Sequence, residues 1–315
     1  MLLANYHTHT ARCRHAWGED KEYVENAIQE GMKVLGFSDH CPWIFPKDYV
    51  SHTRMEPQEL DGYFYALEAL RQEYARDITI YIGFESEYIP ELMEEQNQLL
   101  DGYPVDYMIL GEHFTASEVT GPYTGFPTES EQDLEKYVDL CIAGMETGKY
   151  VYVAHPDLIH YTGPDEIYEE HMERLCRYLK GKDIPVEINL LGVVEKRHYT
   201  SERFLKIAQR IGNSAIIGCD AHTPDRLSNP EYIQTCLDLA QRFGLPVTFC
   251  LGLCRKHENL FVFCSLQKCK ISNCTAEILT FPAKGAIIKS LNTCKNGAHH
   301  RKGVCPFFML FYGKF

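Results

Sequence analysis

The stretch Tyr6-His7-Thr8-His9-Thr10 ends an apolar run at residues 2–6, and the pattern that begins there continues over about 250 residues. Short apolar runs alternate with longer amphipathic stretches. The predicted strands span residues 2–6, 34–38, 78–83, 107–111, 150–154, 186–189 and 215–219. The predicted helices span residues 20–31, 57–76, 91–101, 129–147, 165–181, 201–212 and 230–243. Regular strand–helix alternation predicts a parallel sheet.

The number of units favours an α/β barrel. Seven strand–helix units in about 250 residues are typical of a closed barrel of the TIM type or a relative of it. A doubly wound open sheet is the competing fold. The sequence has neither a G-x-G-x-x-G motif after the first predicted strand nor a P-loop, so nothing indicates a nucleotide-binding open sheet.

Possible metal ligands follow almost every predicted strand. Such residues end the first, second, third, fourth, fifth and seventh strands, and they are His7, His9, His40, Glu85, His113, His155, Asp220 and His222. In a parallel barrel these strand ends meet on one face. Within the H-x-H and D-x-H pairs, alternation points both side chains to one side of a strand. His15 lies on the loop after the first strand.

Each of these residues taken alone has a simpler interpretation. A single histidine at a strand end is usually a core or rim residue, and a lone aspartate before a helix is usually an N-cap. The constellation favours metal binding, because burying so many unpaired rings would be costly. Imidazoles with carboxylates suit Zn, Mn or Fe. Nine ligands suit two or three divalent ions with Glu85 as a bridge, an arrangement typical of phosphate ester hydrolysis.

Composition limits the other classes of function. The net charge of −13 makes nucleic acid an unlikely partner, because binding to phosphates needs basic patches. No apolar run approaches the roughly 20 residues of a membrane span. The N-terminus lacks the features of a signal peptide. We therefore expect a cytoplasmic enzyme that acts on a small-molecule phosphate ester.

The last part of the chain has a different composition. Residues 250–315 carry a net charge of +8 and seven of the 13 cysteines, whereas residues 1–249 carry −21. No C-x-x-C pair is present there, which makes a zinc ribbon a weak alternative. We expect one domain at residues 1–250 and an atypical, poorly ordered tail at 251–315 of foreign or out-of-frame origin.

Residues 1–250 resemble the PHP (polymerase and histidinol phosphatase) phosphoesterases, in particular the monofunctional histidinol-phosphatases. The matching stretches are Tyr6-His-Thr-His-Thr10, Cys13-Arg-His-Ala16, Phe37-Ser-Asp-His-Cys-Pro42, Gly83-Phe-Glu-Ser-Glu-Tyr-Ile-Pro90, Val105-Asp-Tyr107, Gly111-Glu-His-Phe114, Ala154-His-Pro-Asp-Leu-Ile159, Glu187-Ile-Asn189 and Gly218-Cys-Asp-Ala-His222. The resemblance implies a distorted seven-stranded (β/α) barrel of the PHP type with a trinuclear site.

The resemblance also implies how the ligands are shared. One ion would take His7, His9, Glu85 and Asp220, a second Glu85, His113 and His155, and a third His15, His40 and His222. The family binds the substrate phosphate with basic residues, for which we predict Arg197, Lys196, His198 and, more weakly, Arg54. Solvated surface charge is the alternative for Arg54 and Lys196. The residues predicted to take part in the chemistry are Asp220, His222 and Arg197.

Two stretches differ from the histidinol-phosphatase pattern. Asn189-Leu-Leu-Gly192 stands where that branch has Asn-Thr-Ala-Gly, and Gly111-Glu-His113 stands where it has Ser-Val-His. Both flank the expected substrate pocket. The first hypothesis is hydrolysis of L-histidinol phosphate. The alternatives are another PHP activity on a nucleotide, oligonucleotide or phosphotyrosine, and a non-catalytic, metal-stabilised module.

Overall fold

The computed structural model describes residues 1–249 and 251. The strands are β1 (Ala4–Asn5), β2 (Val34–His40), β3 (Thr79–Ser86), β4 (Tyr107–Leu110), β5 (Val186–Asn189) and β6 (Ala215–Gly218). The α-helices are α1 (Asp20–Gln29), α2 (Leu60–Glu73), α3 (Met93–Leu100), α4 (Glu131–Glu146), α5 (Asp165–Gly181), α6 (Leu190–Val194), α7 (Glu202–Ile211), α8 (Asp225–Ser228) and α9 (Pro230–Arg242). Short 3-10 turns are η1 (Ala11–Cys13), η2 (Pro46–Asp48), η3 (Pro57–Glu59) and η4 (Pro90–Leu92).

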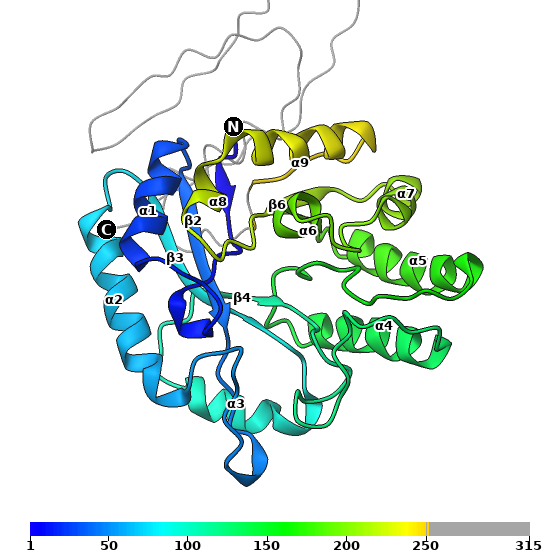
Figure 1. The fold of residues 1–315 in the computed structure, drawn as a ribbon, viewed down its shortest axis with the longest axis horizontal. Coiled ribbons are helices and arrows are strands. Elements are labelled where there is room, and N and C mark those ends of the chain that lie inside the picture. Colours follow the sequence, from blue (N-terminus) through cyan, green and yellow to red (C-terminus); the bar gives the residue numbers. More distant parts are fainter. Residues whose placement is uncertain (250, 252–315) are drawn as a thin grey trace, which may run out of the picture. The chain divides into compact units, whose positions relative to one another are not determined.

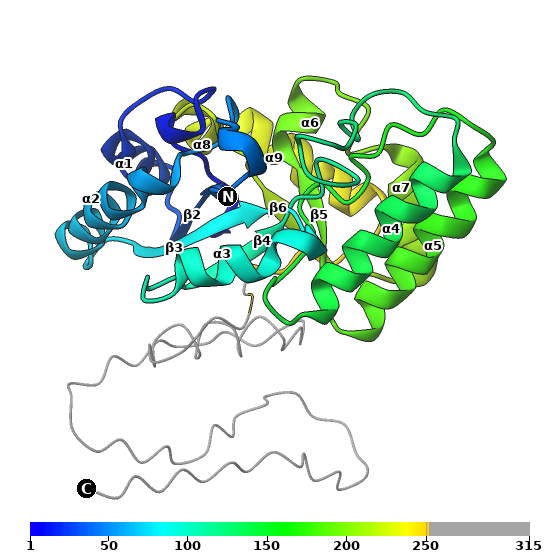
Figure 2. The same cartoon turned by 90° about the horizontal axis from the view of Figure 1, so that it is seen from below.

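The strands form an α/β fold with a curled parallel sheet in two parts. One part has the order β1-β2-β3-β4 and the other pairs β5 with β6, and every pairing is parallel. A parallel bridge between Thr8 and Ala221 joins the chain after β1 to the chain after β6. Helices cover the outside: α1 and α2 flank β2 and β3, whereas α4, α5 and α7 lie on the opposite side (Figures 1 and 2).

The strand predicted at residues 150–154 is reduced to a single parallel bridge between Val153 and Leu110. On the β4 side, Val151 and Ala154 still donate their main-chain N–H groups to Met108 and Leu110. Toward β5, the described residues show no ladder. The structure thus has six strands and a bridge where the sequence predicted seven strands, because residues 150–154 pair through a single bridge and not through a continuous ladder.

Helices α4 and α7 begin at side-chain caps that satisfy a first-turn N–H group. Ser130 accepts from Asp133 N before α4, and Ser201 accepts from Phe204 N before α7. Gly212 ends α7 with a positive φ of 79°, a conformation that glycine adopts at little cost. The predicted long helices agree with the observed bounds to within a few residues. No helix in the described part of the chain is long and apolar enough to cross a membrane.

The inside of the curled sheet is filled by aromatic side chains. Tyr6, Tyr81, Tyr107 and Tyr152 form its inner cluster together with small and branched residues. Tyr107 of β4 lies very close to β3. A Cβ on residue 83 would be 2.2 Å from the main-chain oxygen of Tyr107, so Gly83 is required there. This packed layer closes the sheet interior below the strand ends, and the polar residues gather above it.

Candidate metal centre and substrate pocket

The structure brings all nine predicted ligands together at the carboxyl ends of the strands. The parallel register places His40, the last residue of β2, opposite Glu85 of β3. The other ligands follow strand ends or the bridge at Val153, and His15 comes from the turn after η1. Neighbouring imidazoles are close throughout, with ring centroids 4.2 Å apart for His9 and His222 and 5.1 Å apart for His113 and His155. The cluster is continuous from His15 to His155.

Distances within the cluster match the spacing of ligands around a metal ion. Atoms roughly 2.0–2.2 Å from a tetrahedral ion lie roughly 3.3–3.6 Å from one another. His7 Nε2 lies 3.5 Å from both Glu85 Oε2 and Asp220 Oδ1. His9 Nε2 lies 3.4 Å and 3.2 Å from the same two oxygens. These four side chains therefore have the spacing of a four-ligand site.

Several overlapping groups of three ligand atoms could hold an ion, each with its atoms within 4.8 Å of one another. These groups include His7–Glu85–His155, His7–His9–Asp220, His9–His40–His222 and Cys13–His15–His222. Glu85 also lies 3.4 Å from His113 and 3.2 Å from His40. With His7, His9 and, at 2.8 Å, His155, its two oxygens thus face five histidines, an arrangement that suits a bridging carboxylate.

Unpaired buried atoms provide the test of whether metal fits. No hydrogen-bond partner among the described residues reaches His7 Nε2, either ring nitrogen of His9, His222 Nε2 or Glu85 Oε2. Leaving buried polar atoms unpaired is costly unless something else compensates. Lone pairs of imidazoles and a carboxylate that point to a common space suit divalent cations, so the residues present fit a metal centre.

Outer partners determine which imidazole nitrogen faces the cluster. Glu187 Oε1 lies 2.9 Å from His7 Nδ1, and Glu87 Oε1 lies 2.9 Å from His113 Nδ1. The carbonyl of Cys13 lies 2.7 Å from His15 Nδ1. Each contact makes Nδ1 the donor and leaves Nε2 for the cluster. Neither glutamate is among the ligands predicted from the sequence, although Glu87 follows the end of β3, two residues after Glu85, and Glu187 precedes Asn189 by two residues on β5.

The central carboxylates are held in their anionic form. Burial acts to raise the pKa of Glu85, but the imidazoles of His113, His7 and His40 outweigh it and hold the pKa well below its usual range. The pKa of Asp220 is likewise held well below its usual range, because His7, His9 and His222 outweigh the effect of burial. The same interactions raise the pKa of His7 well above its usual range, so a bound cation would replace the proton of this imidazole beside the two carboxylates.

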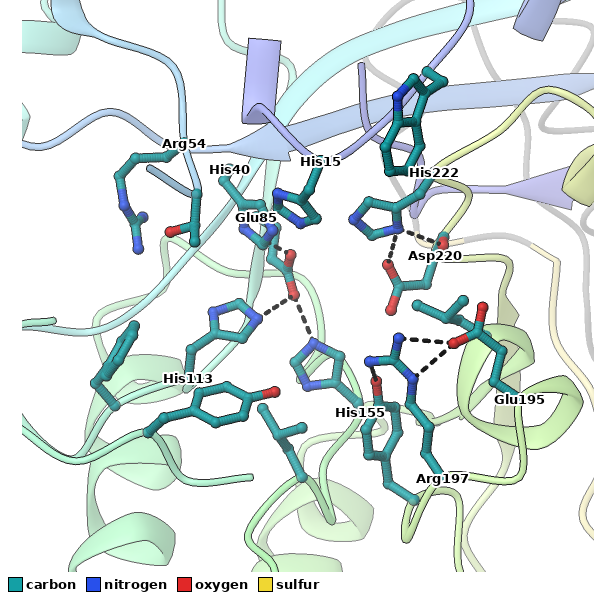
Figure 3. Close-up of a pocket in the computed structure, with 17 residues that line it drawn as sticks. His15, His40, Arg54, Glu85, His113, His155, Glu195, Arg197, Asp220 and His222 are labelled. Atoms are coloured by element: carbon teal, nitrogen blue, oxygen red, sulfur yellow. Dashed lines mark hydrogen bonds and ion pairs between the residues drawn. The ribbon is translucent and has the colours of Figure 1, made fainter. Parts of the chain in front are cut away.

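A cavity of about 600 Å³ opens above the cluster. Its floor is made by the ligands His15, His40, Glu85, His113, His155, Asp220 and His222. Phe114, Tyr123 and Tyr199 contribute aromatic walls. Figure 3 shows Arg197 directed into this space below Asp220 and beside His155, with Arg54 across the pocket. The structure therefore places seven of the predicted metal ligands and two cationic side chains around one cavity.

The basic residues predicted to bind phosphate have different surroundings. Arg197 is paired with Glu195 at 2.8 Å and donates to the Tyr199 hydroxyl at 3.1 Å. Arg54 is 3% exposed and pairs with Glu87 at 2.9 Å and Glu118 at 2.8 Å.

The other two predicted phosphate ligands do not line this cavity. Lys196 is exposed. His198 Nε2 lies 2.6 Å from the carbonyl oxygen of Leu158, and its ring stacks on His160. Of the four basic residues, Arg197 and Arg54 are thus the two that the pocket contains.

Two proteins with similar sequences are named as histidinol-phosphatases. A probable histidinol-phosphatase of Deinococcus radiodurans is 27% identical over 258 residues, which cover 78% of this chain and 96% of that protein. The histidinol-phosphatase of Lactococcus lactis is 24% identical over 238 residues, covering 72% of this chain and 86% of that protein.

Solved structures share the fold. The histidinol phosphate phosphatase of Lactococcus lactis, crystallised with Zn, L-histidinol and phosphate, superposes with a TM-score of 0.61 at 22% identity, covering 79% of this chain and 97% of that one. A putative histidinol phosphatase from Listeria monocytogenes gives a TM-score of 0.57 at 20% identity, covering 73% of this chain and 99% of that one. The model of the PHP domain matches residues 5–190, and the chain belongs to the PHP domain family.

Proposed function

We propose that this protein is a metal-dependent phosphomonoesterase that hydrolyses L-histidinol phosphate to L-histidinol and phosphate in histidine biosynthesis. The observation that carries the proposal is the cluster of nine predicted ligands, seven of which line a cavity into which Arg197 is directed. The matches to the two relatives named histidinol-phosphatase extend over 96% and 86% of the length of those proteins. The Lactococcus protein with Zn, L-histidinol and phosphate has the same fold.

The proposed cofactor is two or three divalent ions, Zn, Mn or Fe, with Glu85 as the bridge. His7, His9, Glu85 and Asp220 would hold the first, Glu85, His113 and His155 the second, and His15, His40 and His222 the third. The spacing of the first group supports its assignment. When bound, such ions supply a hydroxide nucleophile near neutral pH and neutralise charge on the phosphoryl oxygens.

The remaining side chains would bind and orient the substrate. Arg197 is placed to contact a phosphoryl oxygen, because its guanidinium is in the cavity and 41% of the side chain is exposed. Asp220 and His222 would act at the reacting centre from the same edge of the cavity. Phe114, Tyr123 and Tyr199 offer flat faces suited to an imidazole or an ammonium group.

Three further proposals concern the fold, the cellular location and the domain boundary. We propose that the curled sheet is the closed, distorted seven-stranded barrel of the PHP type, with the bridge at Val153 in place of a full strand. We also propose a cytoplasmic location, which the free, buried state of all six cysteines in the described residues supports. The domain boundary near residue 250 remains a proposal, and the tail at 251–315 lies outside the described residues apart from Leu251.

A kinetic panel tests the substrate assignment. The full chain, loaded with Zn²⁺ or Mn²⁺, is assayed against L-histidinol phosphate, a nucleoside monophosphate, a phosphotyrosine peptide and a short oligonucleotide. The proposal predicts the highest kcat/KM for L-histidinol phosphate. A higher value for one of the others would identify a different PHP activity. Metal binding without hydrolysis of any of them would identify a non-catalytic module.

A further inference from the structure

Glu187 is a buried carboxylate that is not one of the nine ligands, although it contacts their surroundings at several points. Its side chain is 0% exposed. Oε1 lies 2.9 Å from His7 Nδ1, and Oε2 accepts from the main-chain N–H of His155 at 2.6 Å. Oε2 also accepts from the side-chain amide of Asn189 at 3.0 Å. One side chain therefore connects β5 to ligands that come from two other parts of the sheet.

Asn189 carries the connection to a third ligand. It stands two residues after Glu187, on the same face of β5, because strand side chains alternate. Its amide nitrogen donates to Asp220 Oδ2 at 3.1 Å as well as to Glu187. His7, His155 and Asp220 are thus all linked to the Glu187–Asn189 pair.

Two of these ligands have backbone conformations that need support. His155 has φ of 31° and Asp220 has φ of 48°, both in the left-handed region that residues other than glycine seldom adopt. Such conformations persist where the surroundings hold them in place. The Glu187 carboxylate holds the His155 main-chain N–H, and Asn189 holds the Asp220 side chain.

The neighbouring strand β6 has a glycine next to this carboxylate. A Cβ built on Gly218 of β6 would lie 1.8 Å from Glu187 Oε1 and 2.6 Å from its carboxyl carbon. Residue 218 pairs with Asn189 in the β5–β6 register. A methyl group at residue 218 would therefore displace the carboxylate without changing the chemistry of Glu187.

We propose that Glu187 is a positioning residue that sets the affinity of the ion sites containing His7 and His155. The inference rests on the proposed metal centre and adds a residue to it. A carboxylate that accepts from the outer nitrogen of a ligand histidine fixes the tautomer and the ring orientation, and losing such a partner typically weakens metal binding about 10- to 100-fold. The proposed third site, His15, His40 and His222, contains neither His7 nor His155, so the effect is selective.

The experiment titrates the metal-stripped full chain with Zn²⁺ against a competing chelator and measures affinity and stoichiometry. The variants are Glu187→Gln and Gly218→Ala. Glutamine keeps the size of the side chain but cannot offer two anionic acceptors, and the alanine methyl displaces an intact carboxylate. Asn213→Ala is the control, because Asn213 is buried and donates to the Cys176 carbonyl at 3.0 Å, a contact that involves no ligand residue.

The expected result is a 10- to 100-fold loss of Zn²⁺ affinity at part of the sites in both variants, with the remaining sites and the Asn213→Ala control close to wild type. Circular dichroism on the same samples reports the fold, and Gly218→Ala decides the matter if Glu187→Gln does not fold. Wild-type affinity in both variants would overturn the inference, and so would equal loss at every site in all three variants. A wild-type chain that binds no Zn²⁺ would overturn the proposed function, and the inference with it.

Discussion

Arg197 and Arg54 both line the pocket, and their surroundings predict different consequences when each is removed. Arg197 is 41% exposed and has one carboxylate partner, Glu195. Arg54 is nearly inaccessible and stands between two carboxylates, Glu87 and Glu118. We therefore expect Arg197 to act mainly on substrate and Arg54 to act mainly on the fold.

Arg197→Ala should lower kcat/KM about 10- to 150-fold, because a charge-assisted contact to a phosphoryl oxygen contributes about 1.5–3 kcal/mol. Metal content, measured on the same sample, should stay at the wild-type value. Arg210→Ala is the matched control, since Arg210 pairs with Glu169 and Glu173 and does not line the pocket. An unchanged kcat/KM for Arg197→Ala would show that the residue is a rim charge.

Arg54→Ala should lower the free energy of unfolding by about 3–5 kcal/mol, because Glu87 would be left as a buried charge without its cation. Chemical denaturation of the metal-loaded variant and of the wild type measures this difference in unfolding free energy. Because Glu87 also holds His113, some loss of bound metal should accompany the loss of stability. If stability is unchanged and kcat/KM falls sharply, Arg54 is a substrate-binding residue, as the sequence analysis suggested.

The sequence predicted residues that the structure brings together in one cluster, but it did not predict their outer partners. His7, Glu85 and Asp220 follow predicted strands within short motifs, so a parallel sheet alone brings them to one edge. The contact between His7 and Glu187 joins residues 180 positions apart, and no local pattern indicates it. A glutamate in a strand next to a metal-binding edge was the available sign, because a buried carboxylate needs a partner.

At the scale of elements, β3 and β4 approach too closely for a side chain at residue 83. Gly83→Ala would place a methyl group 2.2 Å from the Tyr107 main-chain oxygen, and a strand backbone cannot move aside as a flexible side chain can. We expect a loss of about 1–3 kcal/mol in unfolding free energy. Because Glu85 follows two residues later, metal affinity should fall as well.

Gly62→Ala provides the contrasting substitution when the unfolding free energies of the two variants are measured. Gly62 is exposed in α2, and an added Cβ meets nothing within 4 Å. Alanine should stabilise the helix by about 0.5–1 kcal/mol. Equal effects of the two substitutions would mean that the close approach of β3 and β4 is not what requires Gly83.

Element boundaries show where sequence patterns were adequate. The long helices were predicted well, because amphipathic periodicity and caps such as Ser201 and Gly212 are local. The structure has a single bridge where the strand at 150–154 was predicted, and the short helix α6 was not predicted. Apolar residues at 150–154 reflect burial, but strand pairing depends on a neighbour that sequence does not specify. Helix α6 begins directly after β5 at the Asn189 cap, leaving no loop to mark it.

For the whole molecule, we expect a chain that ends at residue 255 to keep its metal and its activity within a factor of a few. All nine predicted ligands, and the pocket-lining residues found in the described part of the chain, lie within residues 1–249. A chain that ends at residue 244 is the informative comparison. It would lose the bridge between Ala215 and Val247 and the Phe249 carbonyl that accepts from Tyr6, and it should be less stable. Loss of metal or folding in the 255-residue chain would place the domain boundary further along.

The most direct test of the central claim is a metal titration of phosphatase activity. The full chain is stripped with a chelator, and hydrolysis of L-histidinol phosphate is followed as Zn²⁺ or Mn²⁺ is added in measured equivalents. The account predicts no activity in the stripped protein and full recovery at two to three equivalents, with little further change. Undiminished hydrolysis by the stripped protein, or no hydrolysis at any metal content, would contradict it.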